Sequence, residues 1–139
     1  MYYSINPTVG AGHTVSISFA SAFAQMAFSF AAFSGIKTTS PFESQVAATS
    51  NTQSGNITPN ANDIIVASIA GDNSFSAATP TINDSFILLP QNTGQGSNGA
   101  NLGIAYLIAP STAAIDPTWS GMGVGGRAVF AAQAVFAHA

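Results

Sequence analysis

The sequence contains no cysteine and very few charged residues. The lack of cysteine excludes disulfides, thiol catalysis and cysteine-ligated metal sites, and it leaves the cellular compartment open. Charged residues make up only 5% of the 139 residues, and Lys37 and Arg127 are the whole cationic complement. Nucleic acids and acidic membrane surfaces are recognised through clustered basic side chains, so we expect neither as a partner.

Patterns that carry catalysis or bind metals are also missing. Nothing pairs two of the carboxylates as a glycosidase requires, and all of them lie near Gly, Pro or Ser, where short carboxylates accept hydrogen bonds from turn backbone. His13 and His138 are the only histidines, and a metal site built on them would need a carboxylate partner. We therefore expect no enzymatic activity, no cofactor and no metal. The acidic residues are Glu43, Asp63, Asp72, Asp84 and Asp116.

The polar surface of this chain has to rely on Ser, Thr, Asn and Gln, because the net charge is only -3. Such surfaces suit chains that are held in an assembly or lie outside the cell, where charge repulsion matters less. The start, "MYYSINPTVG", lacks the basic residues and apolar run of a signal peptide. Either the mature chain is given or no signal is needed. We expect a location in a virion, at the cell surface or outside the cell.

The uncharged stretch "AQMAFSFAAFSGI", residues 24–36, is compatible with a membrane helix, a filament-packing helix or a buried strand. Met26, Phe28 and Phe30 alternate with small residues, which is strand period, although Phe residues also recur here at helical spacing. The neighbouring "HTVSISF" places Val15, Ile17 and Phe19 on one face of a strand. We favour a strand over both helical interpretations.

An internal repeat supports the same choice. Tyr3-Ser-Ile-Asn-Pro7 matches Tyr106-Leu-Ile-Ala-Pro110 at an offset of 103 residues, and the same offset places "AAF" on "AVF". The second copy ends in "RAVFAAQAVFAHA", which is too short to cross a bilayer as a helix, since that takes roughly 20 apolar residues. If both copies share a shape, neither is a membrane helix.

The remainder of the chain reads as short strands between turn clusters. No linker divides residues 1–139, so we predict one domain. Regularly spaced strands with polar, Gly-rich turns predict an all-β fold, a single antiparallel β-sandwich with a pseudo-repeat of strands in 1–36 and 104–139. The expected strands and turns lie in "SPFESQVAATS", in Ile64–Ala70, in "TPTINDSFILLP", in "NLGIAYLIA" and in a short piece at Trp119.

Three stretches together resemble a known domain: "GHTVSISF" followed by "FAAFSGI", then "ITPNANDIIVASIA", then "IAYLIAP" with "PTWS" and "AVFAAQAVF". They are similar to a domain that recurs in bacterial secreted proteins and phage virion proteins. The resemblance covers most of the chain and implies a non-enzymatic, jelly-roll-like β-sandwich. Phe33 and Ala32 stand where that family often has Tyr and Glu, so no ligand site is carried over to them.

The repeat is unequal, because the stretch from Ile57 to Gly103 has no counterpart ahead of residues 1–36. Three explanations remain open. The chain is a fragment, the fold closes without those strands, or a neighbouring chain supplies strands to an open edge, since unpaired edges invite pairing.

These features favour a structural protein that self-associates, as a homo-oligomer or polymer, or that packs on other virion or surface proteins. A phage capsid decoration or tail accessory protein is the first expectation, and an extracellular filament or surface-layer subunit is the next. The alternative is a carbohydrate-binding or adhesion module. The candidate ligand or partner surface comprises Asn92, Gln95, Asn98, Asn101 and Trp119, although Trp119 also suits a role in the core at a strand end.

Overall fold

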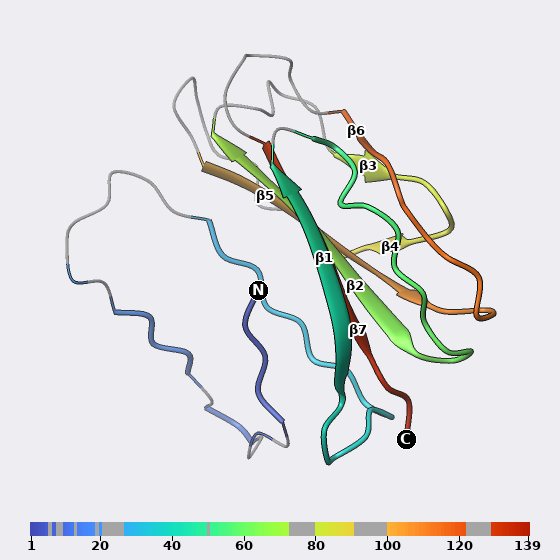
Figure 1. Ribbon diagram of the computed structural model, residues 1–139. Helices are drawn as coiled ribbons and strands as arrows, with labels where there is room; N and C mark the ends of the chain where they lie inside the picture. Colours follow the sequence, from blue (N-terminus) through green and yellow to red (C-terminus); the bar gives the residue numbers. More distant parts are fainter. Residues whose placement is uncertain are drawn as a thin grey trace.

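The computed structural model describes residues 1–5, 7, 10–12, 14–18, 20, 27–49, 51–72, 80–90, 100–121 and 129–139. Within these residues every regular element is a β-strand, so the all-β prediction is confirmed (Figure 1). No helix in the described part of the chain is long and apolar enough to cross a membrane. The strands are β1 (Phe42–Thr49), β2 (Ile64–Asp72), β3 (Thr81–Ile82), β4 (Ile87–Leu88), β5 (Ala100–Ile108), β6 (Trp119–Ser120) and β7 (Val129–Phe136).

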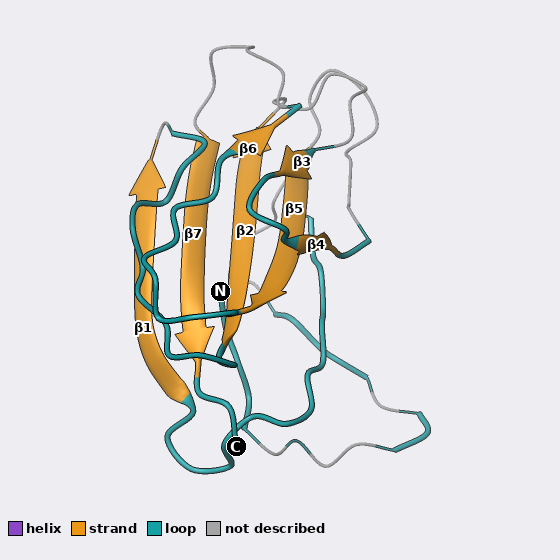
Figure 2. Ribbon diagram, turned by 90° about the vertical axis from the view of Figure 1, so that its right-hand side faces the viewer, coloured by secondary structure: helices purple, strands orange, loops and turns teal. Residues whose placement is uncertain are grey.

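Five strands form one antiparallel sheet in the order β1-β7-β2-β5-β4, and β3 and β6 form a second, two-stranded sheet. Strand β7, the last along the chain, lies between β1 and β2. Figure 2 shows the small sheet lying over one face of the large sheet. In Figure 1 the described parts of the N-terminal segment, residues 1–36, lie on the opposite side.

The central strands form where the sequence is apolar and β-branched. The predicted strand Ile64–Ala70 lies within β2, which is buried on both faces at Ile64, Ile65 and Val66. A strand buried on both faces favours such a continuous apolar run over alternation. The strands predicted in "NLGIAYLIA", at Trp119 and in "AVFAAQAVF" correspond to β5, β6 and β7.

The single strand expected in "TPTINDSFILLP" is wrong, because it is divided into β3 and β4, which belong to different sheets. A turn separates them, with φ values of 58° at Asp84 and 62° at Ser85. The side-chain Oδ1 of Asn83 accepts a 2.7 Å hydrogen bond from the Thr118 N–H. Asn and Asp tolerate this left-handed backbone well. Through this hydrogen bond, Asn83 also ties the turn to the backbone just before β6. The polar pair therefore ends one strand and begins another.

The main core lies between the large sheet and the small sheet. Ile65, Ile69 and Val135 are fully buried there, and Trp119 of β6 is only 2% exposed. The remaining buried members of this cluster are Ile57, Ala67, Phe86, Ala105 and Ala109. We call this side of the large sheet the closed face.

The pseudo-repeat is not reproduced as paired strands. Its second copy forms β5 and β7, whereas residues 14–18 and 27–35 of the first copy lie in no strand, and Ile36 makes only an isolated bridge to His138. Strands at 13–19 and 24–36 were expected, so this expectation is wrong for the described residues 14–18 and 27–35. The described part of the segment packs the rings of Tyr3 and Phe33 on the face of the large sheet and does not join the sheet as a strand.

Candidate functional site

The face of the large sheet opposite the small sheet is mostly apolar; we call it the open face, and its register positions end with Asp72 of β2 opposite Ala100 of β5. Side chains paired across the strands share a face, so the register of the strands defines its membership. The members are Phe42, Gln45, Ala47 and Thr49 of β1; Ile64, Val66, Ser68 and Ala70 of β2; Leu102, Ile104, Tyr106 and Ile108 of β5; and Phe130, Ala132, Ala134 and Phe136 of β7.

The N-terminal segment covers one end of the open face, which we call the lower half. The Tyr3 ring stacks on Phe42 at a centroid distance of 6.0 Å and meets Phe136 edge-on at 5.2 Å. Phe33 meets Tyr106 edge-on at 5.4 Å. These contacts bury a second, smaller cluster on the open face, composed of Ile64, Val66, Ala134 and Phe136.

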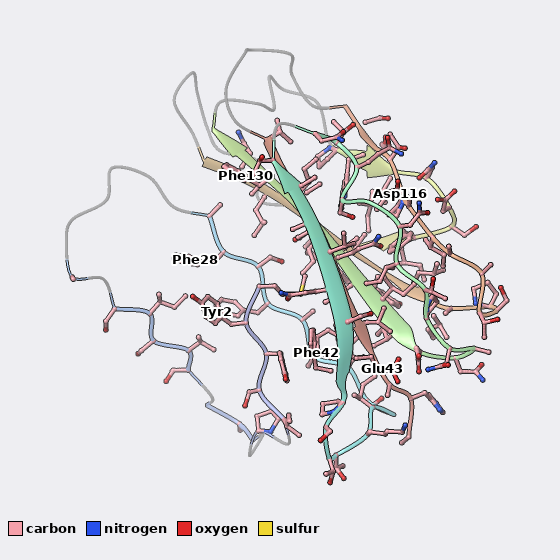
Figure 3. The ribbon with its side chains drawn as sticks, viewed as in Figure 1. Tyr2, Phe28, Phe42, Glu43, Asp116 and Phe130 are labelled. Carbon is pink, nitrogen blue, oxygen red and sulfur yellow. The ribbon has the colours of Figure 1, made fainter. Side chains whose placement is uncertain are left out.

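The other end of the open face, the upper half, is not buried. Phe130 is 50% exposed, and Ala47 and Thr49 are also exposed. Figure 3 shows Phe130 at this end of the sheet, while Phe42 and Glu43 lie at the other end of β1. No member of the upper half is classed as buried, in contrast to the lower half. The upper half comprises Ala47, Thr49, Ser68, Ala70, Leu102, Ile104, Phe130 and Ala132.

The N-terminal segment exposes apolar side chains of its own. Its 36 residues contain no Asp, Glu, Lys or Arg. Val15 is 66% exposed, Phe30 65% and Ile17 45%. Figure 3 shows Tyr2 and Phe28 of this segment on the same side of the large sheet. One chain therefore exposes apolar side chains both at Phe130 in the upper half and at Val15, Ile17 and Phe30 of this segment.

Strand β1 forms an edge of the large sheet. Among the described strands it pairs only with β7, with an irregularity in register between Phe42 and Ser44. Bulges at sheet edges commonly limit pairing with another chain, but the following residues, Gln45 to Thr49, continue in regular register. This regular part of β1 retains an outer edge on which a further strand can pair.

Two carboxylates approach each other at the lower end of β1. Asn60 Nδ2 donates to Glu43 Oε1 and Oε2 at 3.3 and 3.1 Å, and Asn60 N–H donates to Asp63 Oδ2 at 2.7 Å. The other oxygen of Asp63, Oδ1, accepts a 3.0 Å bond from the His138 N–H. Asp63 is 3% exposed, whereas Glu43 lies at the surface.

Their surroundings move the two pKa values apart. Burial alone would raise the pKa of Asp63, but hydrogen bonds from the backbone N–H groups of His138 and Asn60 outweigh burial and lower it. Burial, together with the neighbouring Asp63, raises the pKa of Glu43 above its ordinary value, against the weaker opposing effects of Lys37 and Asn60. Both oxygens of Asp63 accept backbone hydrogen bonds, so this residue serves the turn at 60–63 and the C-terminal backbone, as short carboxylates in turns do.

The residues predicted as a ligand surface are only partly described. Asn101, in β5, is 4% exposed, and Trp119, in β6, is 2% exposed. Neither side chain offers an accessible platform, and Trp119 packs in the core of the closed face. Asn92, Gln95 and Asn98 lie outside the described residues. No group of three or more potential metal ligands occurs among the residues that the structure describes.

The open face is the feature that the sequence interpretation did not identify as a site. A signal for it exists in β7, where Phe130, Ala132, Ala134 and Phe136 recur at a spacing of two. That spacing places them on one face of a strand, yet it does not say whether a second layer covers them.

Comparisons with protein-family models, with curated proteins and with solved structures find no match to this chain. The likeness to a domain of secreted and virion proteins therefore stays a prediction from the motifs. No relative assigns a role to a residue of the open face or to the Glu43–Asp63 pair.

Proposed function

We propose that this protein is a non-enzymatic structural protein that works by self-association. Its assembly surface is the open face together with the outer edge of β1. The observation that carries the proposal is Phe130, half exposed in the upper half of the open face beside the exposed Ala47 and Thr49 of β1. The assemblies that fit such a subunit are a phage virion, as a capsid decoration or tail accessory protein, and an extracellular filament or surface layer.

The energetics of burial support association. Complete burial of a Phe or Ile side chain stabilises by about 1.5–3 kcal/mol. Phe130 and Ile108 of the open face and Phe30 of the N-terminal segment are 50%, 59% and 65% exposed. Several such side chains, buried together in each partner, are of the right size to offset an association cost of about 4–15 kcal/mol. Extended apolar patches on a soluble chain mark interaction sites more often than not.

We further propose that the assembled form is a jelly-roll-like β-sandwich. A sheet that is apolar on both faces needs a layer on each of them. The small sheet with its adjoining loops supplies the layer on the closed face. Burial of the open face would supply the other, which fits the sandwich that the sequence motifs imply.

The test is the molar mass of the purified protein by light scattering over a range of concentrations. We expect a multiple of 14.0 kDa for the unmodified chain. Ala47→Lys places a charge on the exposed upper half and should reduce this mass towards that of one chain, because burying an unpaired ammonium is costly. Ala113→Lys is the matched control, since Ala113 is also exposed but lies outside the open face.

A chain that stays at 14.0 kDa at all concentrations would exclude self-association. An assembly that Ala47→Lys leaves unchanged would show that the open face is not the contact surface. Far-ultraviolet circular dichroism of both lysine variants separates loss of assembly from loss of the sheet.

A further inference from the structure

We infer that the outer edge of β1 pairs with β1 of a second copy, antiparallel and centred on Ala47, so that two large sheets join into one. This pairing rests on the proposed function and names the partner strand and its register.

Among the described strands, the two edges of the large sheet differ in their protection against pairing. β4 forms one edge with only two residues, and Pro90 follows it closely. Short edge strands and proline are two ways in which natural sheets keep a further strand from pairing. β1 forms the other edge with eight residues, and Figure 2 shows it as the outermost strand on its side. Of these two edges, β1 is the one that can accept a strand of useful length.

The regular part of β1, Gln45 to Thr49, lacks the sequence features that protect an edge. It contains no charged residue and no proline, and the irregularity in register lies before it, between Phe42 and Ser44. In an antiparallel pair, alternate residues of a strand direct their N–H and C=O groups away from the partner strand. On the outer edge of β1 these groups must bond to water or to another strand.

The sequence of this edge complements itself when two copies run antiparallel. Gln45, Ala47 and Thr49 share the open face and are exposed. With Ala47 opposite its own symmetry mate, Gln45 of each copy faces Thr49 of the other. The small alanine side chains fit beside the two-fold axis, and an amide opposite a hydroxyl can form a cross-strand hydrogen bond. Such an interface is isologous, because each copy contributes the same residues to it.

Glu43 favours the antiparallel direction over the parallel one. It is the only charged residue of β1, and it is exposed. Parallel pairing in the same register would place the two Glu43 carboxylates side by side, and like charges directly opposite each other destabilise a sheet. Antiparallel pairing centred on Ala47 places them at opposite ends of the paired region instead.

Pairing at this edge also extends the open face. Residues that pair across strands share a face, so the open faces of the two copies lie on the same side of the joined sheet. Thr49 lies opposite Phe130 in the register, and the half-exposed Phe130 therefore lies next to the new strand pair. Two copies joined in this way present one continuous, mostly apolar surface, which suits a subunit that packs into a larger assembly.

The chain has no cysteine, so single introduced cysteines report which residues of two copies meet. Ala47→Cys and Gln45→Cys are each oxidised with copper phenanthroline, and non-reducing electrophoresis measures the yield of disulfide-linked dimer. Gln45→Cys is the matched control, since both residues are exposed on the same face of the same strand.

We expect Ala47→Cys to give roughly tenfold or more the yield of Gln45→Cys, because proximity raises the effective concentration of the thiols. Ala47 lies opposite its own symmetry mate, whereas the two Gln45 residues lie about 13 Å apart along the strands. A disulfide spans a Cα separation of no more than about 7 Å.

A mixture of Gln45→Cys and Thr49→Cys chains with different affinity tags tests the register. We expect a linked heterodimer from the mixture, although neither variant links efficiently to itself. Equal yields from Ala47→Cys and Gln45→Cys would indicate parallel pairing or random collision and would overturn the inference, as would a mixture without heterodimer. Light scattering of the unmodified protein separates the two levels. An assembly without this pattern of cross-links refutes β1 pairing alone, whereas a monomer at every concentration refutes self-association too.

Discussion

Asp63 accepts hydrogen bonds from three segments that meet at the lower end of the molecule. Its carboxylate accepts bonds from Asn60 N–H at 2.7 Å and from His138 N–H at 3.0 Å. Its own carbonyl accepts a 2.8 Å bond from Ala109 N–H. Through its side chain and its backbone carbonyl, this one residue joins the turn before β2, the end of β5 and the backbone after β7.

We expect Asp63→Asn to lower the free energy of unfolding at pH 7 by about 1–3 kcal/mol, because the amide replaces one acceptor oxygen with a donor that faces a backbone N–H. The lowered pKa of Asp63 sets the pH dependence. Its stabilisation is fully present above the unfolded-state pKa of about 3.9, and it is lost as the pH falls through the lower folded-state pKa. The difference between wild type and variant should therefore shrink in acid, as urea denaturation at several pH values would reveal.

Glu43→Gln is the matched control, since Glu43 is exposed and shares Asn60 with Asp63. The pKa of Glu43 is raised, so its ionised form is disfavoured in the folded state. Glu43→Gln should change stability at pH 7 by no more than about 0.5 kcal/mol. Equal losses from Asp63→Asn and Glu43→Gln would contradict the role assigned to Asp63.

At the scale of elements, the side-chain amide of Gln133 in β7 holds the loop that follows β1. Gln133 is 1% exposed, and its Nε2 donates to the carbonyl oxygens of Gly55 and Ile115 at 2.6 and 3.2 Å. The Gly55 N–H in turn donates to Asp116 Oδ1 at 3.0 Å. This junction holds the loop against the closed face, where Ile57 is buried.

Gly55 is required at this junction for two reasons, and we expect Gly55→Ala to destabilise the fold by about 1–3 kcal/mol. Its φ is 101°, and an added Cβ would lie 3.2 Å from Val46 Cγ2. Gly35→Ala is the control, because Gly35 has a φ of 77° but an added Cβ there would meet only ordinary contacts with His138. Thermal unfolding of both variants separates backbone strain from the contact with Val46.

A double-mutant cycle with Val46→Ala sharpens this comparison. If the contact with Val46 contributes, the losses from Gly55→Ala and Val46→Ala should be less than additive, with a coupling of about 0.5–3 kcal/mol. The contact would be shown not to contribute if the losses in the free energy of unfolding were strictly additive and Gly55→Ala lost no more than Gly35→Ala. The side chain of Val46 would then move aside without an energetic penalty.

The sequence predicts the central strands better than the peripheral ones. β2, β5 and β7 are identified by apolar runs such as "IIVASIA", because burial on both faces removes the need for alternation. The turn at Asn83-Asp84 is visible in the sequence, but whether it interrupts a strand or separates two sheets depends on pairing with residues near Thr118. Local patterns do not contain that long-range choice.

The failure in the described parts of residues 13–19 and 24–36 has a different cause. Their alternation is typical of strands, but it does not decide whether a segment pairs at a sheet edge or packs on a sheet face. The second copy pairs beside β2, whereas the described part of the first copy packs the rings of Tyr3 and Phe33 on the face of the sheet. Among the proposed site residues, Trp119 could be interpreted equally well as a ligand platform or a core residue, and its burial favours the core.

At the scale of the whole molecule, the chain has two basic and five acidic residues. Electrostatic interactions therefore contribute little to any contact between copies. We expect the assembly to keep its molar mass from about 0.05 to 1 M NaCl, since salt screens charges but does not weaken apolar burial, and sulfate should strengthen it. Sedimentation velocity across this series measures the effect, and dissociation in NaCl would contradict an apolar interface.

The order of strands in the large sheet also governs when the sheet can form during synthesis. β1 has its described partner in β7, which leaves the ribosome about 90 residues later, and β2 needs the same strand on one side. Such distant pairings fold slowly, because the intervening chain must be ordered first. The nascent chain therefore exposes the edges of β1 and β2 until β7 emerges, and it is most exposed to aggregation and to chaperones during that interval.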